Sequence, residues 1–123
     1  MIGKVYWSTF PFYDSATRRN AFKHRPVLIV SGPRNNDYTV LPVSSVSIRT
    51  NIDPEYDIPV DPALYPDLHL TKLCYVRTHK QTIVHRASLT SPLGDMKNDY
   101  PDLYISVLAK LEAYNAEIMN QAI

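Results

Sequence analysis

An arginine and a pair of serines stand beside two predicted strands, where they could hold a phosphate group. Arg25 precedes an apolar run at residues 27–30, and Ser44 and Ser45 end a second run that begins at Tyr38. A guanidinium presents a fixed fork of N–H donors that can hold a phosphate through two hydrogen bonds, and a serine hydroxyl can donate to a phosphate oxygen. Two such strands could therefore carry a cation and hydroxyls into one groove.

A third segment, residues 73–80, reads as another strand and carries Arg77 and His79. Because side chains alternate along a strand, these two residues are expected to share a face. Arg77 could steady negative charge on a phosphate, and an imidazole can accept a proton at neutral pH. An exposed histidine at the end of a strand fits the same pattern equally well, so the role of His79 stays open.

The densest basic patch of the sequence consists of Arg18, Arg19 and Lys23. Such a patch either is solvated or contacts an RNA backbone. His24 adjoins Arg25 and, in an extended strand, is expected to point the opposite way. The four histidines are accompanied by no cysteine or acidic cluster at ligand spacing, so the sequence predicts neither a metal site nor another cofactor.

The elements that must position these residues are mainly short strands. The predicted strands lie at residues 5–10, 25–31, 38–45, 56–60, 73–80 and 82–85. We expect a polar loop at residues 11–22, a turn at 33–37 and an end to the β pattern at 91–94. Four prolines interrupt the segment 48–66, which excludes a helix there.

The last segment has a different period. From Pro101 onwards apolar residues recur at spacings of three and four, which places them in one stripe on a helix. The stripe consists of Tyr104, Val107, Leu108, Leu111, Tyr114 and Ile118. Short strands followed by one helix favour a mainly β fold, a small and strongly bent barrel with a C-terminal helix. The stripe is expected to dock on the barrel or on a second subunit, and this unpaired apolar surface predicts a homodimer.

Composition indicates a single domain over residues 1–123. The chain has 45% apolar residues, enough for one core, and its net charge of +1 argues against a protein that coats nucleic acid through overall charge. A nucleic-acid site must then be local. The single cysteine, Cys74, excludes an intramolecular disulfide, and the sequence shows no secretory signal and no apolar run of membrane-spanning length. We therefore expect a cytoplasmic protein.

Four ordered blocks of the sequence resemble the MazF/PemK family of toxin endoribonucleases. They are "GKVYW" at residues 3–7, "RPVLIVS" at 25–31, "LPVSS" at 41–45 and "VRT" at 76–78. No single block is specific, and the resemblance depends on their order and spacing over most of residues 1–90. It implies an SH3-like barrel that forms a dimer and cleaves single-stranded RNA without a metal. It also implies an antitoxin whose tail fills the RNA groove.

The resemblance assigns roles to particular residues. It favours a phosphate-binding role for Arg25 and a hydrogen-bonding role for Ser44, although both residue types are also common at strand ends. The mechanism begins when a base removes the proton from the ribose 2′-OH, whose oxygen attacks the adjacent phosphorus while arginines steady the developing charge. The predicted catalytic residues are Arg25, Ser44, Arg77 and His79, and the predicted RNA-binding residues are Arg18, Arg19, Lys23, Ser45 and Thr78.

The general base is the open point of this assignment. Members of the family commonly carry Arg-Thr-Ile-Asp where this chain has Arg77-Thr78-His79-Lys80. In strict register the acidic residue matches Lys80, and a shifted turn would place His79 there instead.

Two other classes of function also remain open. A toxin of the related CcdB type shares the barrel and poisons DNA gyrase by binding alone. A barrel without catalysis could bind only an antitoxin or another protein. Arg25, Ser44 and Arg77 favour the nuclease, whereas the missing acidic residue after Thr78 keeps the binding-only classes open.

Overall fold

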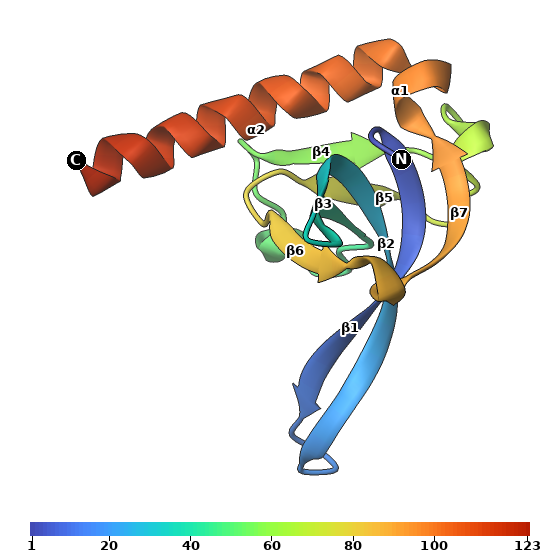
Figure 1. Ribbon diagram of the computed structural model, residues 1–123. Coiled ribbons are helices and arrows are strands. Elements are labelled where there is room, and N and C mark those ends of the chain that lie inside the picture. Colours follow the sequence, from blue (N-terminus) through green and yellow to red (C-terminus); the bar gives the residue numbers. More distant parts are fainter.

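A seven-stranded antiparallel sheet, curled into a half-barrel, forms most of the molecule (Figure 1). The computed structural model describes residues 1–123, apart from the side chain of Phe12. The strands are β1 (Lys4–Asp14), β2 (Arg19–Arg34), β3 (Asp37–Ser44), β4 (Asp57–Val60), β5 (Cys74–Arg77), β6 (Thr82–His85) and β7 (Leu89–Asp95). Their order is β4-β5-β3-β2-β1-β7, and β6 also pairs with β3. The predicted mainly β barrel with a C-terminal helix is confirmed.

Two short apolar clusters fill the two faces of the curled sheet. Successive residues of a strand point to opposite faces, so Leu28 joins one cluster while Val27 and Ile29 join the other. The larger cluster lies between the sheet and the helices α1 (Met96–Asp99) and α2 (Pro101–Ala122). Its buried members are Val5, Leu28, Leu41, Val43, Val60, Leu68, Cys74, Val76, Met96, Leu103, Tyr104 and Val107.

Strands β1 and β2 continue well beyond the barrel as a two-stranded arm (Figure 1). The predicted loop at 11–22 is therefore wrong, because Pro11 pairs with Phe22 and Asp14 pairs with Arg19. The arm has no core to cover, so its strands lack the alternation of apolar and polar residues that would have revealed them. Tyr13 is 63% exposed and Phe22 is 73% exposed.

The turn between β2 and β3 and two of the short strands agree with the sequence-based expectations. Asn35 and Asn36 join β2 to β3 with φ angles of 52° and 65°, a left-handed conformation that asparagine tolerates. The strand expected at residues 56–60 is β4, and the strand expected at 82–85 is β6.

Strand β7 runs through residues 91–94, where we expected the β pattern to end, so that prediction is wrong. Pro92 is tolerated because β7 is an edge strand and a proline there removes no ladder bond to a further strand. At Gly94 a Cβ atom would lie 2.5 Å from the carbonyl oxygen of Asp67, so this glycine lets a loop approach the strand closely.

The helix predicted from Pro101 is confirmed as α2, but the sheet covers only its first half. Val107 is buried, Leu111 and Tyr114 are partly buried, and Ile118 is 41% exposed. The helix extends past the edge of the sheet towards the C-terminus (Figure 1). Neither helix is long and apolar enough to cross a membrane.

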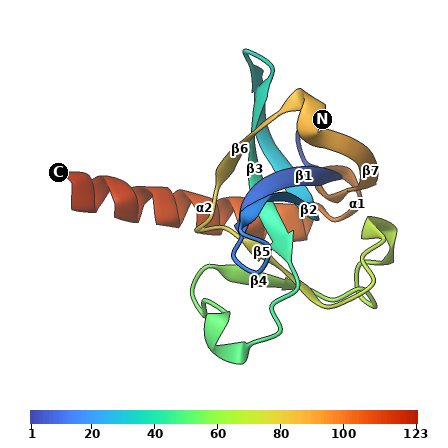
Figure 2. The same cartoon turned by 90° about the horizontal axis from the view of Figure 1, so that it is seen from below.

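The connections around β4 complete the fold. They contain short 3-10 helices at Arg49–Asn51 and Pro66–Leu68, and a third lies at Arg86–Ser88 before β7. Figure 2, turned by 90°, shows the connections before and after β4 on one side of the sheet, with the β2–β3 turn at the opposite end. The connection after β4 brings residues 69–72 to the root of the arm, where these residues line a hollow together with β1 and β2.

Candidate active site

A hollow of about 340 Å³ lies where the arm leaves the barrel. The strands β1, β2, β3 and β5 and the connection after β4 all contribute to its walls. The lining residues are Trp7, His24, Arg25, Pro26, Val43, Ser44, Ser45, His69, Leu70, Thr71, Lys72 and Cys74.

Strand pairing brings Arg25 and the serines together in this hollow. Arg25 lies on β2 opposite Ser8, and Ser44 is the last residue of β3, opposite Tyr75 of β5. Because β2 and β3 are neighbours in the sheet, the cation at the start of one apolar run and the hydroxyls at the end of the other line one cavity. Arg25 is exposed, so its guanidinium is accessible to a ligand.

The hollow is a positive environment. Arg25 and Lys72 line it together with two imidazoles, and none of its lining residues carries a carboxylate. Burial raises the pKa of the Cys74 thiol, which therefore stays protonated and uncharged at neutral pH. Cations in a concave site favour an anionic ligand such as a phosphate.

A second hollow, of about 310 Å³, shares Arg25 with the first. Its lining residues are Phe10, Pro11, Lys23, Arg25, Pro42, Lys80 and Thr82. Lys23 and Lys80 therefore line a hollow together with Arg25. Arg18 and Arg19 line neither hollow and lie at the tip of the arm.

Arg77 and His79 lie elsewhere, around the buried carboxylate of Asp57. Arg77 donates from Nε to Asp57 Oδ1 at 3.1 Å and from Nη2 to Oδ2 at 3.2 Å. Nη2 also donates to the carbonyl oxygen of Asn51 at 2.7 Å, and the side chain of Asp57 is 0% exposed. Neither Arg77 nor His79 lines either of the two hollows. In this structure, then, Arg77 holds a buried acid in place and His79 lies beside it.

His79 packs between aromatic rings beside this ion pair. Its Nδ1 lies 3.7 Å from Asp57 Oδ1, which is too long for a hydrogen bond, and its ring centroid is 6.3 Å from that of Tyr56 and 6.2 Å from that of Tyr114. Strand β5 ends at Arg77, so His79 belongs to the following turn and not to the predicted strand.

Thr78 requires a correction. Its side chain is fully buried and its hydroxyl donates to the carbonyl oxygen of Tyr56 at 2.7 Å. A buried hydroxyl with a protein partner is not available to RNA, so the expected RNA contact by Thr78 does not fit the structure.

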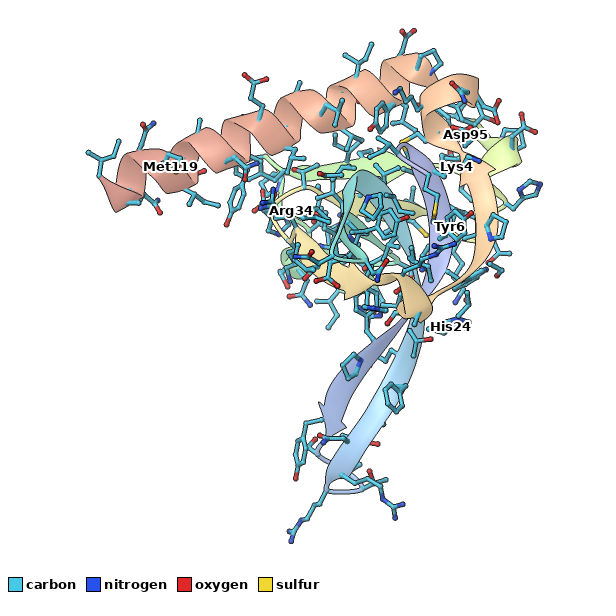
Figure 3. The ribbon with its side chains drawn as sticks, viewed as in Figure 1. Lys4, Tyr6, His24, Arg34, Asp95 and Met119 are labelled. Carbon is cyan, nitrogen blue, oxygen red and sulfur yellow. The ribbon has the colours of Figure 1, made fainter. Side chains whose placement is uncertain are left out.

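Sequence reasoning missed three residues of the hollow, His24, His69 and Lys72. Strand alternation predicted that His24 points away from Arg25, yet both line the hollow. Figure 3 labels His24 at the root of the arm, where its ring centroid lies 5.4 Å from that of Trp7. His69 and Lys72 belong to the proline-punctuated connection, whose path no periodicity could predict.

No group of three or more His, Cys, Asp or Glu side chains in the described part of the chain could hold a metal ion.

Comparison with known proteins places the fold in a family. A solved structure described as an endoribonuclease in complex with its cognate antitoxin, from a mycobacterial species, superimposes with a TM-score of 0.64. The identity is 18% and 94% of each chain is covered, a likeness that shows the shared fold. A search of curated proteins found no match. The family model described as the PemK-like, MazF-like toxin of type II toxin–antitoxin systems matches residues 2–111. This match spans nearly the whole chain, and the protein belongs to that toxin family.

Proposed function

We propose that this toxin is an endoribonuclease that cleaves single-stranded RNA by attack of the 2′-OH, without a metal. It acts in the cytoplasm and a cognate antitoxin neutralises it. Support comes from the family match and from the similar fold of a protein described as an endoribonuclease with its antitoxin. The observation that carries the proposal is the hollow in which Arg25, Lys72, Ser44 and Ser45 converge.

These side chains suit a phosphodiester in the act of cleavage. The fork of Arg25 holds two phosphate oxygens, Ser44 donates a further hydrogen bond and Lys72 supplies a second positive charge. As the 2′-oxygen attacks, negative charge grows on the phosphate oxygens, and donors placed there in advance stabilise the transition state. The 2′-OH is the nucleophile, so the same site distinguishes RNA from DNA.

The flanking RNA follows the cations next to the hollow. Lys23 and Lys80 extend the positive surface from Arg25 into the second hollow, and Arg18 and Arg19 continue it to the tip of the arm. The net charge of +1 makes this local arrangement the source of affinity for the RNA backbone. The antitoxin tail occupies the same hollow and so excludes RNA.

The catalytic role of Arg77 and His79 stays a prediction. The guanidinium of Arg77 donates to Asp57 and Asn51, and the ring of His79 lies beside Asp57, so the proposal rests on Arg25 and Ser44.

The test is to incubate purified protein with a long single-stranded RNA in excess chelator and to map the new ends. We expect a 2′,3′-cyclic phosphate or its hydrolysis product upstream of each cut and a 5′-hydroxyl downstream. RNA with 2′-deoxyribose at the cleaved position should resist. Strict dependence on magnesium, or cleavage of the deoxy substitute, would contradict the mechanism. If the folded protein cuts no RNA, the gyrase-binding and antitoxin-binding alternatives move ahead.

A further inference from the structure

Two imidazoles line the first hollow from different segments of the chain. His24 lies on β2 beside Arg25, and His69 lies on the connection between β4 and β5 beside Lys72. The chain has four histidines, and the other two, His79 and His85, do not line this hollow. An imidazole can give or take a proton at neutral pH, so the hollow contains one group that can act as the acid and one that can act as the base.

The hydrogen bonds of His24 define which ring nitrogen carries the proton in the neutral form. The Thr90 hydroxyl lies 2.9 Å from Nε2 of His24 and donates to the carbonyl oxygen of Trp7 at 3.3 Å. A carbonyl can only accept and a hydroxyl has one hydrogen, so the proton placement that satisfies both contacts has Nε2–H donating to Thr90. Nδ1 is then the unprotonated nitrogen, and no residue in the described structure bonds to it. Thr90 therefore orients a base.

His69 is fixed in the opposite sense. Its Nδ1 lies 2.6 Å from the carbonyl oxygen of Leu93, so Nδ1–H donates and Nε2 is the nitrogen left without a protein partner among the described residues. The backbone of His69 has φ 55° and ψ 29°, a left-handed conformation that is uncommon for a residue other than glycine. The short 3-10 helix that ends at Leu68 holds it there, with the amide of His69 donating to Pro66.

We propose that His24 and His69 are the acid–base pair of the RNA cleavage, an inference that rests on the proposed function. One neutral imidazole takes the proton of the 2′-OH, and the 2′-oxygen forms its bond to phosphorus. The bond from phosphorus to the 5′-oxygen breaks, and the other imidazole, protonated at the start, gives its proton to that oxygen. The products are a 2′,3′-cyclic phosphate and a 5′-hydroxyl, and both imidazoles regain their starting states by exchange with water. No metal or other co-reactant is consumed.

The surroundings of the pair suit these roles. The other charged or titratable groups that line the hollow are Arg25, Lys72 and the Cys74 thiol, which burial keeps protonated. From β7, the uncharged Thr90 contacts His24 and the Leu93 carbonyl contacts His69, and from β1 the ring of Trp7 packs beside His24. No lining group competes as a base, because none is a carboxylate. Proton transfer in the hollow is therefore left to the two imidazoles.

The first experiment measures the pH profile of cleavage for the parent, His24→Gln, His69→Asn and the control His85→Gln. Asparagine is used at residue 69 because it tolerates the left-handed backbone that the position requires. His85 caps a short helix and lines neither hollow, so its variant should cleave like the parent. We expect a bell-shaped profile for the parent. The cleavage rate of His24→Gln and of His69→Asn should fall roughly 100-fold or more, as removal of a general acid or base predicts. Each of these variants should also lose one limb of the bell.

Binding and folding are measured on the same variants. Circular dichroism must match the parent, and affinity for an RNA with 2′-deoxyribose at the cleaved position should change by less than about threefold. Thr90→Val should slow cleavage and displace one limb of the profile, and Thr90→Ser should restore both because it keeps the hydroxyl. If Thr90 had only a structural role, both limbs of the pH profile of Thr90→Val would stay at the pH values of the parent.

The second experiment uses an RNA whose 5′-leaving oxygen is replaced by sulfur. A thiolate leaves without help from an acid, so this substrate should rescue the variant that lacks the acid and not the variant that lacks the base. Rescue of neither variant would overturn the pair, as would a parent-like pH profile in both. In those cases the parent would still cleave RNA and the proposed function would stand. If the parent itself cleaves no RNA, both the function and the pair are wrong.

Discussion

Two arginines of this chain, the same side chain in two surroundings, show how position decides what a residue can do. The exposed guanidinium of Arg25 faces a hollow with hydroxyls and a second cation. The donors of Arg77 are bonded to a fully buried carboxylate and a backbone carbonyl, and its side chain is 14% exposed. Arg25 is therefore available to a ligand, and Arg77 stabilises the fold.

Replacing Arg25 with alanine should slow RNA cleavage roughly 100-fold or more, because it removes the charge and the paired donors from the transition state. Arg25→Lys should recover little, since a point charge does not reproduce two parallel hydrogen bonds. Ser44→Ala should cost less, about 0.5–1.5 kcal/mol for one neutral hydrogen bond. Single-turnover rates on a mapped RNA site measure all three. A folded Arg25→Ala variant with the parent rate would remove Arg25 from the site.

Replacing Arg77 with alanine should lower the free energy of unfolding by about 3–5 kcal/mol, because it leaves the Asp57 carboxylate buried without its partner. Urea denaturation followed by circular dichroism measures the loss. The double variant Arg77→Met with Asp57→Leu is the control, and it should recover part of the stability because no unpaired charge remains. A variant Arg77→Ala that keeps its stability but loses cleavage would instead support the catalytic role predicted from the family resemblance.

At the scale of the elements, the sequence predicted the strands and the helix that pack one face against the core. The apolar run before Ser31, the strand at 82–85 and the helix from Pro101 all carry a periodic pattern because one face of each packs against a cluster. The arm and the edge strand β7 have little or no such cover, so their pairing left no pattern to read.

The site shows the same division. Arg25 and the two serines belong to periodic strands, and their meeting follows from the pairing of β2 with β3. His69 and Lys72 belong to the connection between β4 and β5, which contains Pro62 and Pro66 and in which His69 is left-handed, so its path depends on tertiary contacts. The Asp57 ion pair was missed because it links residues twenty positions apart across β4 and β5.

Tyr56 contacts helix α2 in its C-terminal half. The tyrosine hydroxyl donates to Glu117 at 2.5 Å, which raises the pKa of Tyr56 far above its ordinary value, and its ring meets that of Tyr114 edge-on at 4.9 Å. Tyr56→Phe keeps the ring contact and removes the hydrogen bond. We expect amide exchange to become severalfold faster over residues 112–122, with little change over residues 103–107. Hydrogen exchange with mass spectrometry checks this, and equal protection in the parent and Tyr56→Phe would contradict the tether.

At the scale of the whole molecule, apolar surface remains uncovered where α2 passes the edge of the sheet. A shallow hollow of about 470 Å³ on this helix is lined by Leu108, Leu111, Glu112, Asn115, Ala116 and Met119. Met119 is 59% exposed and Leu108 is 36% exposed. Exposed apolar surface of this kind is typical of an interface.

We expect a homodimer that uses this surface. Sedimentation at micromolar concentration should give twice the mass of the chain, because pairing two such helices removes the exposed apolar side chains from water. Met119→Glu should shift the equilibrium towards the monomer, and Ile105→Glu, on an exposed position outside the hollow, is the matched control. A parent protein that sediments as a clean monomer would contradict the prediction.

The arm also makes the protein divisible. A protease that cuts after arginine would find Arg18 and Arg19 exposed at its tip, and the cut would leave pieces of residues 1–18 and 19–123. The short piece contains β1, which lies between β2 and β7 in the sheet and buries Val5 and Ser8, so strand pairing can hold the two pieces together. Trp7 would then belong to one piece and Arg25 to the other. Neither piece alone contains the whole lining of the hollow, so two separately expressed pieces would complete it only by reassembly.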